Sequence, residues 1–177
     1  MREGWLRLEA EPNALTLNMQ GACMVVNDLA SVVEVRALDR LYQFRRAGTC
    51  EAIREWLGVG GDLRAGWIAL DGRKWLNTEL ILGLQCRELG GVELLCSGGE
   101  MRFRRTPHCQ ALQAWLSEAA PRRAGWLVGE GWGMTLAGVT LVRDDDEVVI
   151  LQRQGRDLRF ADPARCAAVR AWLEAEE

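Results

Sequence analysis

The sequence contains few of the residue patterns on which catalytic and metal sites depend. Its 177 residues include a single histidine, and none of its six cysteines forms a Cys-x-x-Cys pair, which argues against a zinc site. There is no Walker motif and no nucleophile elbow, and no apolar run approaches the roughly 18 residues that a membrane helix requires. We therefore expect no metal, no cofactor, no membrane association and no enzymatic activity.

Basic charge is also scarce over the chain as a whole. The 22 Lys and Arg residues face 25 Asp and Glu residues, which gives a net charge of −3, and Lys74 is the only lysine. The general basic character of many nucleic-acid-binding domains is therefore missing. The N-terminal segment MREGWLRLEAE lacks the charged-then-apolar pattern of a signal peptide, so we expect a cytoplasmic protein with reduced thiols.

What the sequence does contain is one pattern repeated three times. Each copy opens with Arg-x-Gly-Trp, whose tryptophans are Trp5, Trp67 and Trp126. Each closes with Cys-x-Ala-aliphatic-x-x-Trp-Leu, which begins at Cys50, Cys109 and Cys166. A phenylalanine stands six residues before each cysteine and a valine eleven residues before each phenylalanine: Phe44, Phe103, Phe160, Val33, Val92 and Val149. These fixed offsets predict three tandem repeats, 1–61, 62–120 and 121–177.

Within a repeat the pattern predicts an α+β fold, with an antiparallel four-stranded sheet followed by one C-terminal helix. The first strand starts at the Arg-x-Gly-Trp tryptophan and ends at a turn such as Asp71-Gly72, a strong hairpin signal. Gly21 and Gly138 interrupt a long second strand, which indicates a bulge or a sharp bend. The third strand begins near the repeated valine, and the fourth contains the repeated phenylalanine. Asp162-Pro163 is typical of a helix start.

The fourth strand separates apolar from basic side chains. It reads LYQFRR, EMRFRR and DLRFAD in the three repeats, and side chains alternate across a strand. The side that carries phenylalanine must face the core, which leaves the opposite side to a recurring set of arginines. We take these as candidate partner-binding residues: Arg45, Arg102, Arg104 and Arg159. A row of arginines with tryptophans nearby is typical of single-stranded nucleic-acid binding.

The closing helix carries two apolar stripes. Its cysteine, aliphatic residue and leucine form one stripe at helical spacing, which can cover the sheet of the same repeat. Its alanine and tryptophan form a second stripe, which we expect to make inter-repeat or dimer contacts through Trp56, Trp115 and Trp172. Two repeats can satisfy each other in this way. The third is then left to form a homodimer through repeat 3, unless the three repeats close into a ring.

Two local clusters resemble functional sites, one a catalytic pair and the other a cation site, but the spacing of their residues argues against both functions. His108 adjoins Cys109, but neighbouring helix residues point about 100° apart, so the thiol and the imidazole would not face each other. The acidic run from Asp144 to Glu147 lacks the spacing and the central glycine of an EF-hand, which favours a solvated turn. We also expect all six cysteines to remain free of disulfides.

Four strands followed by one helix in about 60 residues resembles the repeat of the Whirly and PUR families, which bind single-stranded nucleic acid. The resemblance rests on element order, repeat length and repeat count, and it covers the whole chain. It implies interlocking repeats and, for three repeats, pairing between the third repeats of two molecules. The segment RFADPARCAAVRAWLEA also resembles the last strand and helix of a split pleckstrin-like domain.

These observations favour binding over catalysis as the function. The weakly acidic balance and the eight tryptophans favour a non-enzymatic scaffold that acts through protein–protein interaction, because tryptophan is enriched at binding hot spots. The alternative is a single-stranded DNA- or RNA-binding protein of Whirly- or PUR-like architecture. The two differ in salt dependence, which is steep for nucleic-acid binding.

Overall fold

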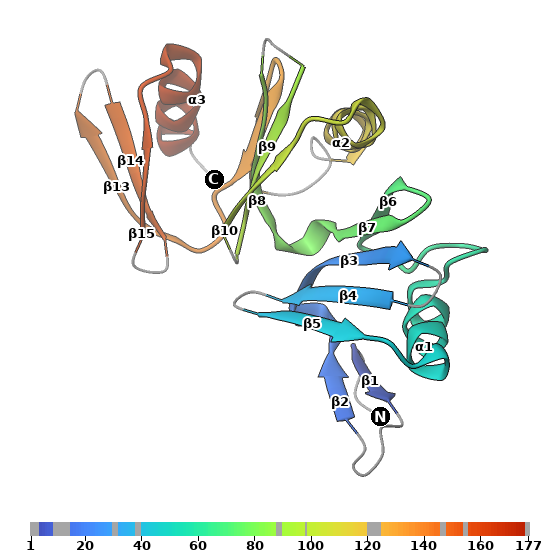
Figure 1. Ribbon diagram of the computed structural model, residues 1–177. Coiled ribbons are helices and arrows are strands. Elements are labelled where there is room, and N and C mark those ends of the chain that lie inside the picture. The colour runs from blue at the N-terminus through green and yellow to red at the C-terminus, as the bar shows by residue number, and fades with distance from the viewer. Residues whose placement is uncertain are drawn as a thin grey trace.

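A computed structural model describes the chain as an α+β protein with antiparallel strands (Figure 1). The described residues are 4–8, 15–29, 32–37, 40–87, 90–97, 99–119, 125–145, 148–153 and 156–175. Within these ranges no helix is both long and apolar enough to cross a bilayer. The chain runs from a two-stranded hairpin at one end of the molecule to a three-stranded sheet at the other.

The elements follow a common order in the three segments that the sequence predicts as repeats, and we keep that word as their name: two strands, a corner, three strands and a helix. The first repeat has β1 (Trp5–Leu8), β2 (Leu15–Asn18), the 3-10 helix η1 (Met19–Gly21), β3 (Ala22–Leu29), β4 (Val32–Ala37), β5 (Leu41–Phe44) and α1 (Ala47–Leu57). The second has β6 (Trp67–Asp71), β7 (Lys74–Asn77), η2 (Thr78–Leu80), β8 (Ile81–Cys86), β9 (Val92–Cys96), β10 (Gly99–Phe103) and α2 (Thr106–Ala119). The third has β11 (Trp126–Gly129), β12 (Trp132–Thr135), β13 (Val139–Asp145), β14 (Val148–Arg153), β15 (Arg156–Phe160) and α3 (Pro163–Glu174).

The sheets do not have the four strands expected for each repeat; among the described residues they have two, five, five and three. One reason is that the long second strand breaks at a 3-10 turn, so that η1 separates β2 from β3 and η2 separates β7 from β8. The other is that a hairpin joins the sheet of the repeat before it. The strand orders are β5-β4-β3-β7-β6 and β10-β9-β8-β12-β11.

A side-chain cap turns the chain at each corner between the hairpin and the following strands. The side chains of Asn18 and Asn77 accept hydrogen bonds from the backbone N–H groups two residues later, at 3.1 and 3.0 Å. Thr135 does the same in the third repeat, through its hydroxyl, at 3.1 Å. Short polar side chains readily bond to nearby backbone in this way, which competes with continuation of the strand. The bend expected at Gly21 is therefore held by Asn18, three residues earlier.

The glycine of each Arg-x-Gly-Trp motif closes the open end of the hairpin. Gly4, Gly66 and Gly125 have φ of 84°, 83° and 82°, a left-handed conformation that favours glycine. Their carbonyl groups accept hydrogen bonds from the N–H of Met19, Thr78 and Leu136, at 2.9, 2.7 and 2.9 Å. The motif therefore recurs in the sequence because the same backbone geometry recurs in the structure.

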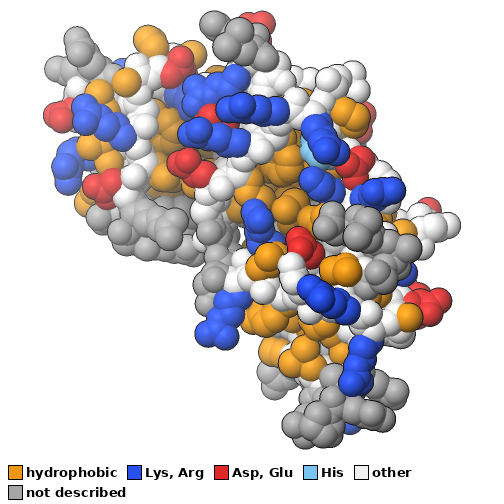
Figure 2. All heavy atoms as spheres, in the orientation of Figure 1, with side chains coloured by type: hydrophobic (Ala, Val, Ile, Leu, Met, Phe, Trp, Pro, Cys, Tyr) orange, Lys and Arg blue, Asp and Glu red, His pale blue; other side chains and the backbone are white. Residues whose placement is uncertain are grey.

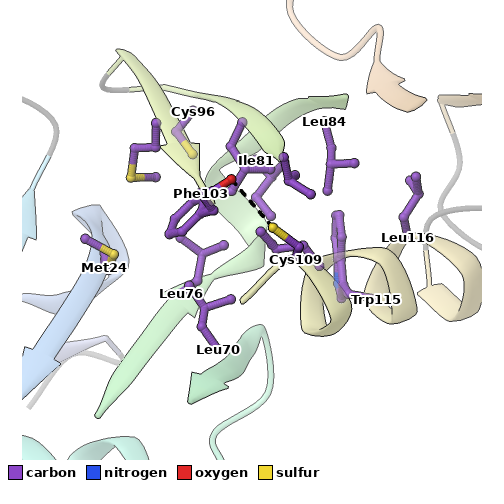
Figure 3. Close-up of a cluster of buried hydrophobic side chains, with 14 of the residues drawn as sticks. Met24, Leu70, Leu76, Ile81, Leu84, Cys96, Phe103, Cys109, Trp115 and Leu116 are labelled. Carbon is purple, nitrogen blue, oxygen red and sulfur yellow. Dashed lines mark hydrogen bonds between the residues drawn. The ribbon is translucent and has the colours of Figure 1, made fainter. Parts of the chain in front are cut away.

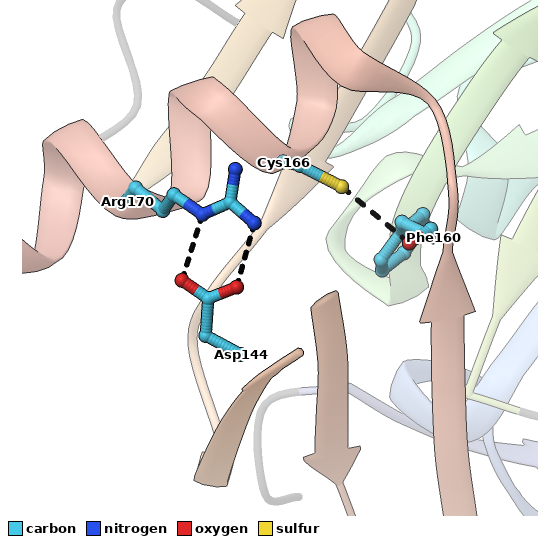
Figure 4. Close-up of polar contacts among 4 residues, drawn as sticks. All are labelled: Asp144, Phe160, Cys166 and Arg170. Atoms are coloured by element: carbon cyan, nitrogen blue, oxygen red, sulfur yellow. Dashed lines mark hydrogen bonds and ion pairs between the residues drawn. The ribbon is translucent and has the colours of Figure 1, made fainter. Parts of the chain in front are cut away.

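A thiol hydrogen bond explains the constant spacing between phenylalanine and cysteine. The Sγ atoms of Cys50, Cys109 and Cys166 donate to the carbonyl groups of Phe44, Phe103 and Phe160, at 3.3, 3.5 and 3.5 Å. Figures 3 and 4 show this bond in the second and third repeats. Each bond joins the first turn of a helix to the end of the strand that precedes it, so it sets the angle at which the helix leaves the sheet.

The apolar stripe at the start of each helix packs on the sheet of its own repeat. Valine, cysteine and the aliphatic helix residue are buried in all three repeats: Val33, Cys50, Ile53, Val92, Cys109, Leu112, Val149, Cys166 and Val169. Figure 3 shows the cluster of the second repeat, where α2 covers β8, β9 and β10. The last stripe residue breaks the pattern, because Leu57 and Leu116 are buried but Leu173 is exposed.

Candidate functional site

The four candidate arginines are all exposed, but only two of them lie within strands. Arg102 belongs to β10 and Arg159 to β15, whereas Arg45 and Arg104 follow the last residues of β5 and β10. Alternation works as the sequence indicates, since Met101 and Phe103 are buried on the other side of β10. In the first and third repeats the corresponding apolar side chains are half-buried.

The structure brings Arg102 and Arg104 together and leaves the other two apart. Arg102 and Arg104 line one groove, Arg159 lines a second cleft, and Arg45 lines neither. The first groove, with a volume of about 470 Å³, also receives Arg36 from β4, Lys74 from β7 and Arg105 from the bend just before α2. We call the set Arg36, Lys74, Arg102, Arg104 and Arg105 the basic groove. It lies between the two five-stranded sheets.

The basic groove carries far more positive than negative charge. Its lining includes five cations, one carboxylate, Glu100, and an apolar wall of Met24, Met101 and Phe103. Figure 2 shows Lys and Arg side chains gathered around the pale blue histidine, which is His108, the only one in the chain. Four of the five cations, Arg36, Lys74, Arg104 and Arg105, have no ion pair within the described ranges. An anion in the groove would therefore not have to displace a carboxylate from them.

Among the described residues, Arg102 is the groove cation that has a carboxylate partner. Its Nε lies 3.2 Å from Oε1 of Glu93, and Arg87 binds the other oxygen of the same carboxylate. The hydrogen bond from Arg87, with smaller contributions from the charges of Arg87 and Arg102, holds the pKa of Glu93 below its ordinary value. Glu93 therefore stays ionised and offsets part of the positive charge at this edge of the groove.

His108 lines the groove but is already paired. The side chain is buried, and its Nε2 lies 2.6 Å from Oδ2 of Asp71, at the end of β6. Burial raises the pKa of Asp71, but the hydrogen bonds from His108 and from the Arg73 N–H outweigh it, and the pKa lies below its ordinary value. An ionised carboxylate only accepts, so the imidazole donates. This bond fastens α2 to the hairpin of the same repeat.

The thiol beside His108 is not activated by it. The Sγ of Cys109 donates to backbone carbonyl groups, and the imidazole packs edge-on against Phe103, with ring centroids 5.8 Å apart. All six cysteines are free, and five of them are buried. Burial raises the pKa of the Cys96 thiol to about 12 and raises that of Cys23 as well. A thiol that stays protonated is a poor nucleophile.

The second cleft has balanced charge. It lies between the face of β8, β9 and β12 and strand β15, has a volume of about 310 Å³, and contains Arg87, Arg159 and Arg165 with Glu93, Glu100 and Asp157. Arg165 stacks over Trp132 at 5.3 Å, and loss of water around its guanidinium lowers its pKa. With three cations against three carboxylates, this cleft attracts a polyanion less strongly than the basic groove does.

The acidic run of the third repeat pairs with a helix arginine. Asp144 accepts two hydrogen bonds from Arg170, at 2.7 and 2.6 Å, as Figure 4 shows. Asp145 is exposed, and Asp146 and Glu147 lie outside the described residues. Among the residues that are described, no three His, Cys, Asp or Glu side chains cluster in a way that could hold a metal ion.

Two of the three candidate tryptophans pack against the next repeat. Trp56 meets Trp67 edge-on, with centroids 6.1 Å apart, and Trp115 meets Trp126 in the same way at 5.5 Å. Both partners are tryptophans of Arg-x-Gly-Trp motifs. Trp172 occupies the same helix position in the third repeat and is exposed.

The sequence alone did not single out Arg36 and Lys74. Each lies in a strand with no recurring basic position, and the two reach the groove only because β7 joins the sheet that contains β4. The unusual single lysine is the one local feature that marks Lys74.

Comparison with known proteins adds little. No family model matches the chain, and no curated protein matches it in sequence. A solved structure described as a LytTr DNA-binding domain from Bacillus cereus aligns with a TM-score of 0.43 and 8% identity, over 66% of this chain and 96% of that one. A TM-score this low does not establish a shared fold, so the likeness carries no weight for function.

Proposed function

We propose that the protein binds single-stranded nucleic acid along the basic groove. The observation that carries the proposal is the gathering of four cations, Arg36, Lys74, Arg104 and Arg105, in one groove of a chain whose net charge is negative. None of the four forms an ion pair with another described residue. A positively charged groove that follows the phosphate backbone is the usual basis of single-strand binding. Arginine suits this role because its planar fork matches the geometry of a phosphate.

The position of the cations suits an extended strand, because its phosphates can follow one groove between two sheets. The apolar lining residues Met24, Met101 and Phe103 are buried, so the proposed contact is made through the cations and the phosphates. The resemblance to Whirly and PUR proteins remains a prediction.

The competing expectation, a non-enzymatic protein-binding scaffold, draws support from other residues. Trp5 and Trp172 are exposed at opposite ends of the chain, and neither lines the basic groove. The two functions therefore use separate surfaces, and a variant that weakens one can leave the other intact.

Fluorescence anisotropy with a labelled oligothymidylate tests the proposal, with a duplex of matched length as competitor. With four phosphate contacts, we expect the logarithm of the affinity to fall against the logarithm of salt concentration with a slope of about −3. The single strand should compete better than the duplex. Absence of binding at low salt, or a slope near zero, would contradict the proposal.

A matched pair of variants locates the site. Arg104 and Arg45 each follow the repeated phenylalanine, and both are exposed, but only Arg104 lines the groove. Arg104→Ala should weaken binding severalfold and reduce the steepness of the salt slope by roughly 0.7, whereas Arg45→Ala should change neither. Equal effects of the two substitutions would place the binding surface elsewhere.

A further inference from the structure

The chain contains the same strand junction twice. At the first, the hairpin strand β7 pairs antiparallel with β3 of the preceding repeat; at the second, β12 pairs with β8 in the same way. Each junction places a hairpin at the edge of a three-stranded meander and extends it to five strands. Within the described residues, the hairpin β1–β2 pairs with no meander and the edge strand β13 pairs with no hairpin, so each represents one half of such a junction.

The register of the two junctions is identical. Met24 lies opposite Leu76, the residue before the capping Asn77, and Gly83 lies opposite Met134, the residue before the capping Thr135. The backbone bonds agree as well, because the N–H groups of Asn27 and Cys86 donate to the carbonyl groups of Arg73 and Gly131, at 2.8 and 2.7 Å. The hairpin therefore attaches in one defined way.

Side chains of the hairpin divide between two cores. Leu70 and Leu76 belong to the core of the second repeat, whereas Trp67 and Trp75 are buried in the core of the first. In the first repeat, Leu8 and Leu17 are likewise buried in their own core. Trp5 and Thr16 stand where Trp67 and Trp75 stand in the second repeat, and both are exposed, since no second core of the described chain packs against them.

The two half-junctions are exposed and apolar. In the part of the chain that the structure describes, β2 pairs only with β1 and β13 only with β14. The hairpin end presents Trp5 and Leu15, which are 39% and 40% exposed. The meander end presents Leu141, 46% exposed, together with Trp172 and Leu173 at the end of α3. Unpaired edges with apolar side chains are ready sites for a further strand.

We propose that the β1–β2 hairpin of a second copy of the chain completes the edge of β13, so that the protein assembles head to tail. The internal register places Leu17 of the second copy opposite Leu141, its Thr16 opposite Val142 and its Leu15 opposite Arg143. The edge-on tryptophan contact should also recur, between Trp172 and Trp5 of the second copy. The hairpin of a second copy is the expected partner of this edge, because a hairpin of the same chain pairs with the equivalent edge strand at both internal junctions.

The hairpin of the same chain does not fill this place. β1 and β2 lie at the opposite end of the molecule from β13 and β14 (Figure 1), so the three repeats do not close into a ring. A contact between a hairpin and a strand edge is heterologous, and such contacts give closed rings or open filaments. The inference thus replaces the expected symmetric pairing of third repeats, and it stands independently of the nucleic-acid proposal.

Disulfide trapping tests the register. Lys74 and Val26, the internal counterparts of Leu15 and Arg143, form a pair without mutual hydrogen bonds, the type of antiparallel pair in which Cα atoms lie about 4.5 Å apart. That separation fits a disulfide. Mixing the Leu15→Cys and Arg143→Cys chains under mild oxidation should give a covalent heterodimer. Leu15→Cys mixed with Val128→Cys, an exposed position on β11, should give none, nor should the chain without added cysteines.

An edge variant and a mass measurement complete the test. The N–H of Met19 faces β1, so alternation turns the N–H of Thr16 toward the open edge, and Thr16→Pro removes a donor there while β1–β2 pairing remains. Light scattering at about 100 μM, a range that detects micromolar affinities, should show a dimer or larger species for the native chain and for Thr16→Val, and a monomer for Thr16→Pro. A monomeric native chain, an unaffected Thr16→Pro variant, or covalent dimers of Arg143→Cys alone would overturn the inference.

Discussion

The second and third repeats end in the same helix motif but place it in different surroundings. Trp115 and Leu116 are 6% and 5% exposed, whereas Trp172 and Leu173 are 45% and 50% exposed. The hairpin that follows α2 makes the difference. Trp126 packs on Trp115, and Gly133 lies so close to Leu116 that an added Cβ would be 2.4 Å from its Cδ1. The same local sequence therefore yields a core position or a surface position according to what comes next.

A second comparison concerns a hydrogen bond between the closing helix and a strand, which the three repeats make with different residue types. Arg54 donates to Asn27 in the first repeat, Gln113 to Cys86 in the second, and Arg170 to Asp144 in the third. In each case the third turn of the closing helix bonds to the end of the first meander strand. This helix-to-strand link is present in all three repeats although its residue types and charges differ. The buried thiol-to-carbonyl link, by contrast, uses cysteine and phenylalanine in all three.

The largest expected difference between the repeats is in the free energy of unfolding lost on Trp115→Ala and on Trp172→Ala. Removing the buried Trp115 should lower the free energy of unfolding by about 3–5 kcal/mol. Removing the exposed Trp172 should change it by less than about 1 kcal/mol when the chain is dilute and monomeric. Urea denaturation measures both. Similar losses for the two variants would show that Trp172 is buried in the monomer after all.

The leucines should repeat this contrast at a somewhat smaller scale. Leu116→Ala leaves a cavity against β12 and should cost about 2–5 kcal/mol. Leu173→Ala should cost less than about 1 kcal/mol, because the side chain is half exposed and no cavity forms. Urea denaturation midpoints at equal slope give the comparison. A large loss for Leu173→Ala in the monomer would contradict it.

The corner asparagines compare a completed junction with an open one. The Asn77 amide is buried and donates to the carbonyl groups of Ala22, at 3.1 Å, and Gln20, at 3.4 Å, across the first junction. Asn77→Ala should cost about 1–3 kcal/mol, since those carbonyls lose a partner. Asn18→Ala loses only an exposed cap, which is worth about 1 kcal/mol or less. Thermal unfolding of both variants provides the measurement, and equal shifts would contradict the argument.

The smallest expected effect is the pH dependence that the helix-to-strand link adds in the third repeat, where the link includes a carboxylate. The hydrogen bonds from Arg170 hold the pKa of Asp144 below its ordinary value. A carboxyl group with a lowered pKa stabilises the fold above its unfolded pKa, and that contribution disappears as the pH falls through the folded value.

Asp144→Asn removes this titration, so the stability difference between the native chain and the variant should shrink on acidification. Because the pair is exposed, added salt should also reduce the difference. The Asn27–Arg54 pair supplies the matched control, since Asn27→Ala should give a difference that does not follow the titration of a carboxyl group. Urea denaturation over a series of acidic pH values measures both.

The sequence by itself determined the local architecture. The spacing of Phe44 and Cys50 fits one thiol-to-carbonyl bond, the Arg-x-Gly-Trp glycine fits one left-handed turn, and Asp162-Pro163 starts α3 as the pattern indicates. Each of these links joins residues close in the chain, and short-range geometry of this kind leaves a residue signature. The exposure of Arg102 in β10 and Arg159 in β15 could also be predicted from the sequence, because side chains alternate between the two faces of any strand.

Only the tertiary structure decided which strands share a sheet and which cations share a groove. Backbone pairing between β7 and β3 uses N–H and C=O groups that every residue except proline carries, so no residue marks the partner in advance. Arg36 and Lys74 meet Arg104 because that pairing brings two sheets together. The burial of Trp115 and the exposure of Trp172 have the same origin, since hydrophobic contact depends on which surface is present and not on the motif that presents it.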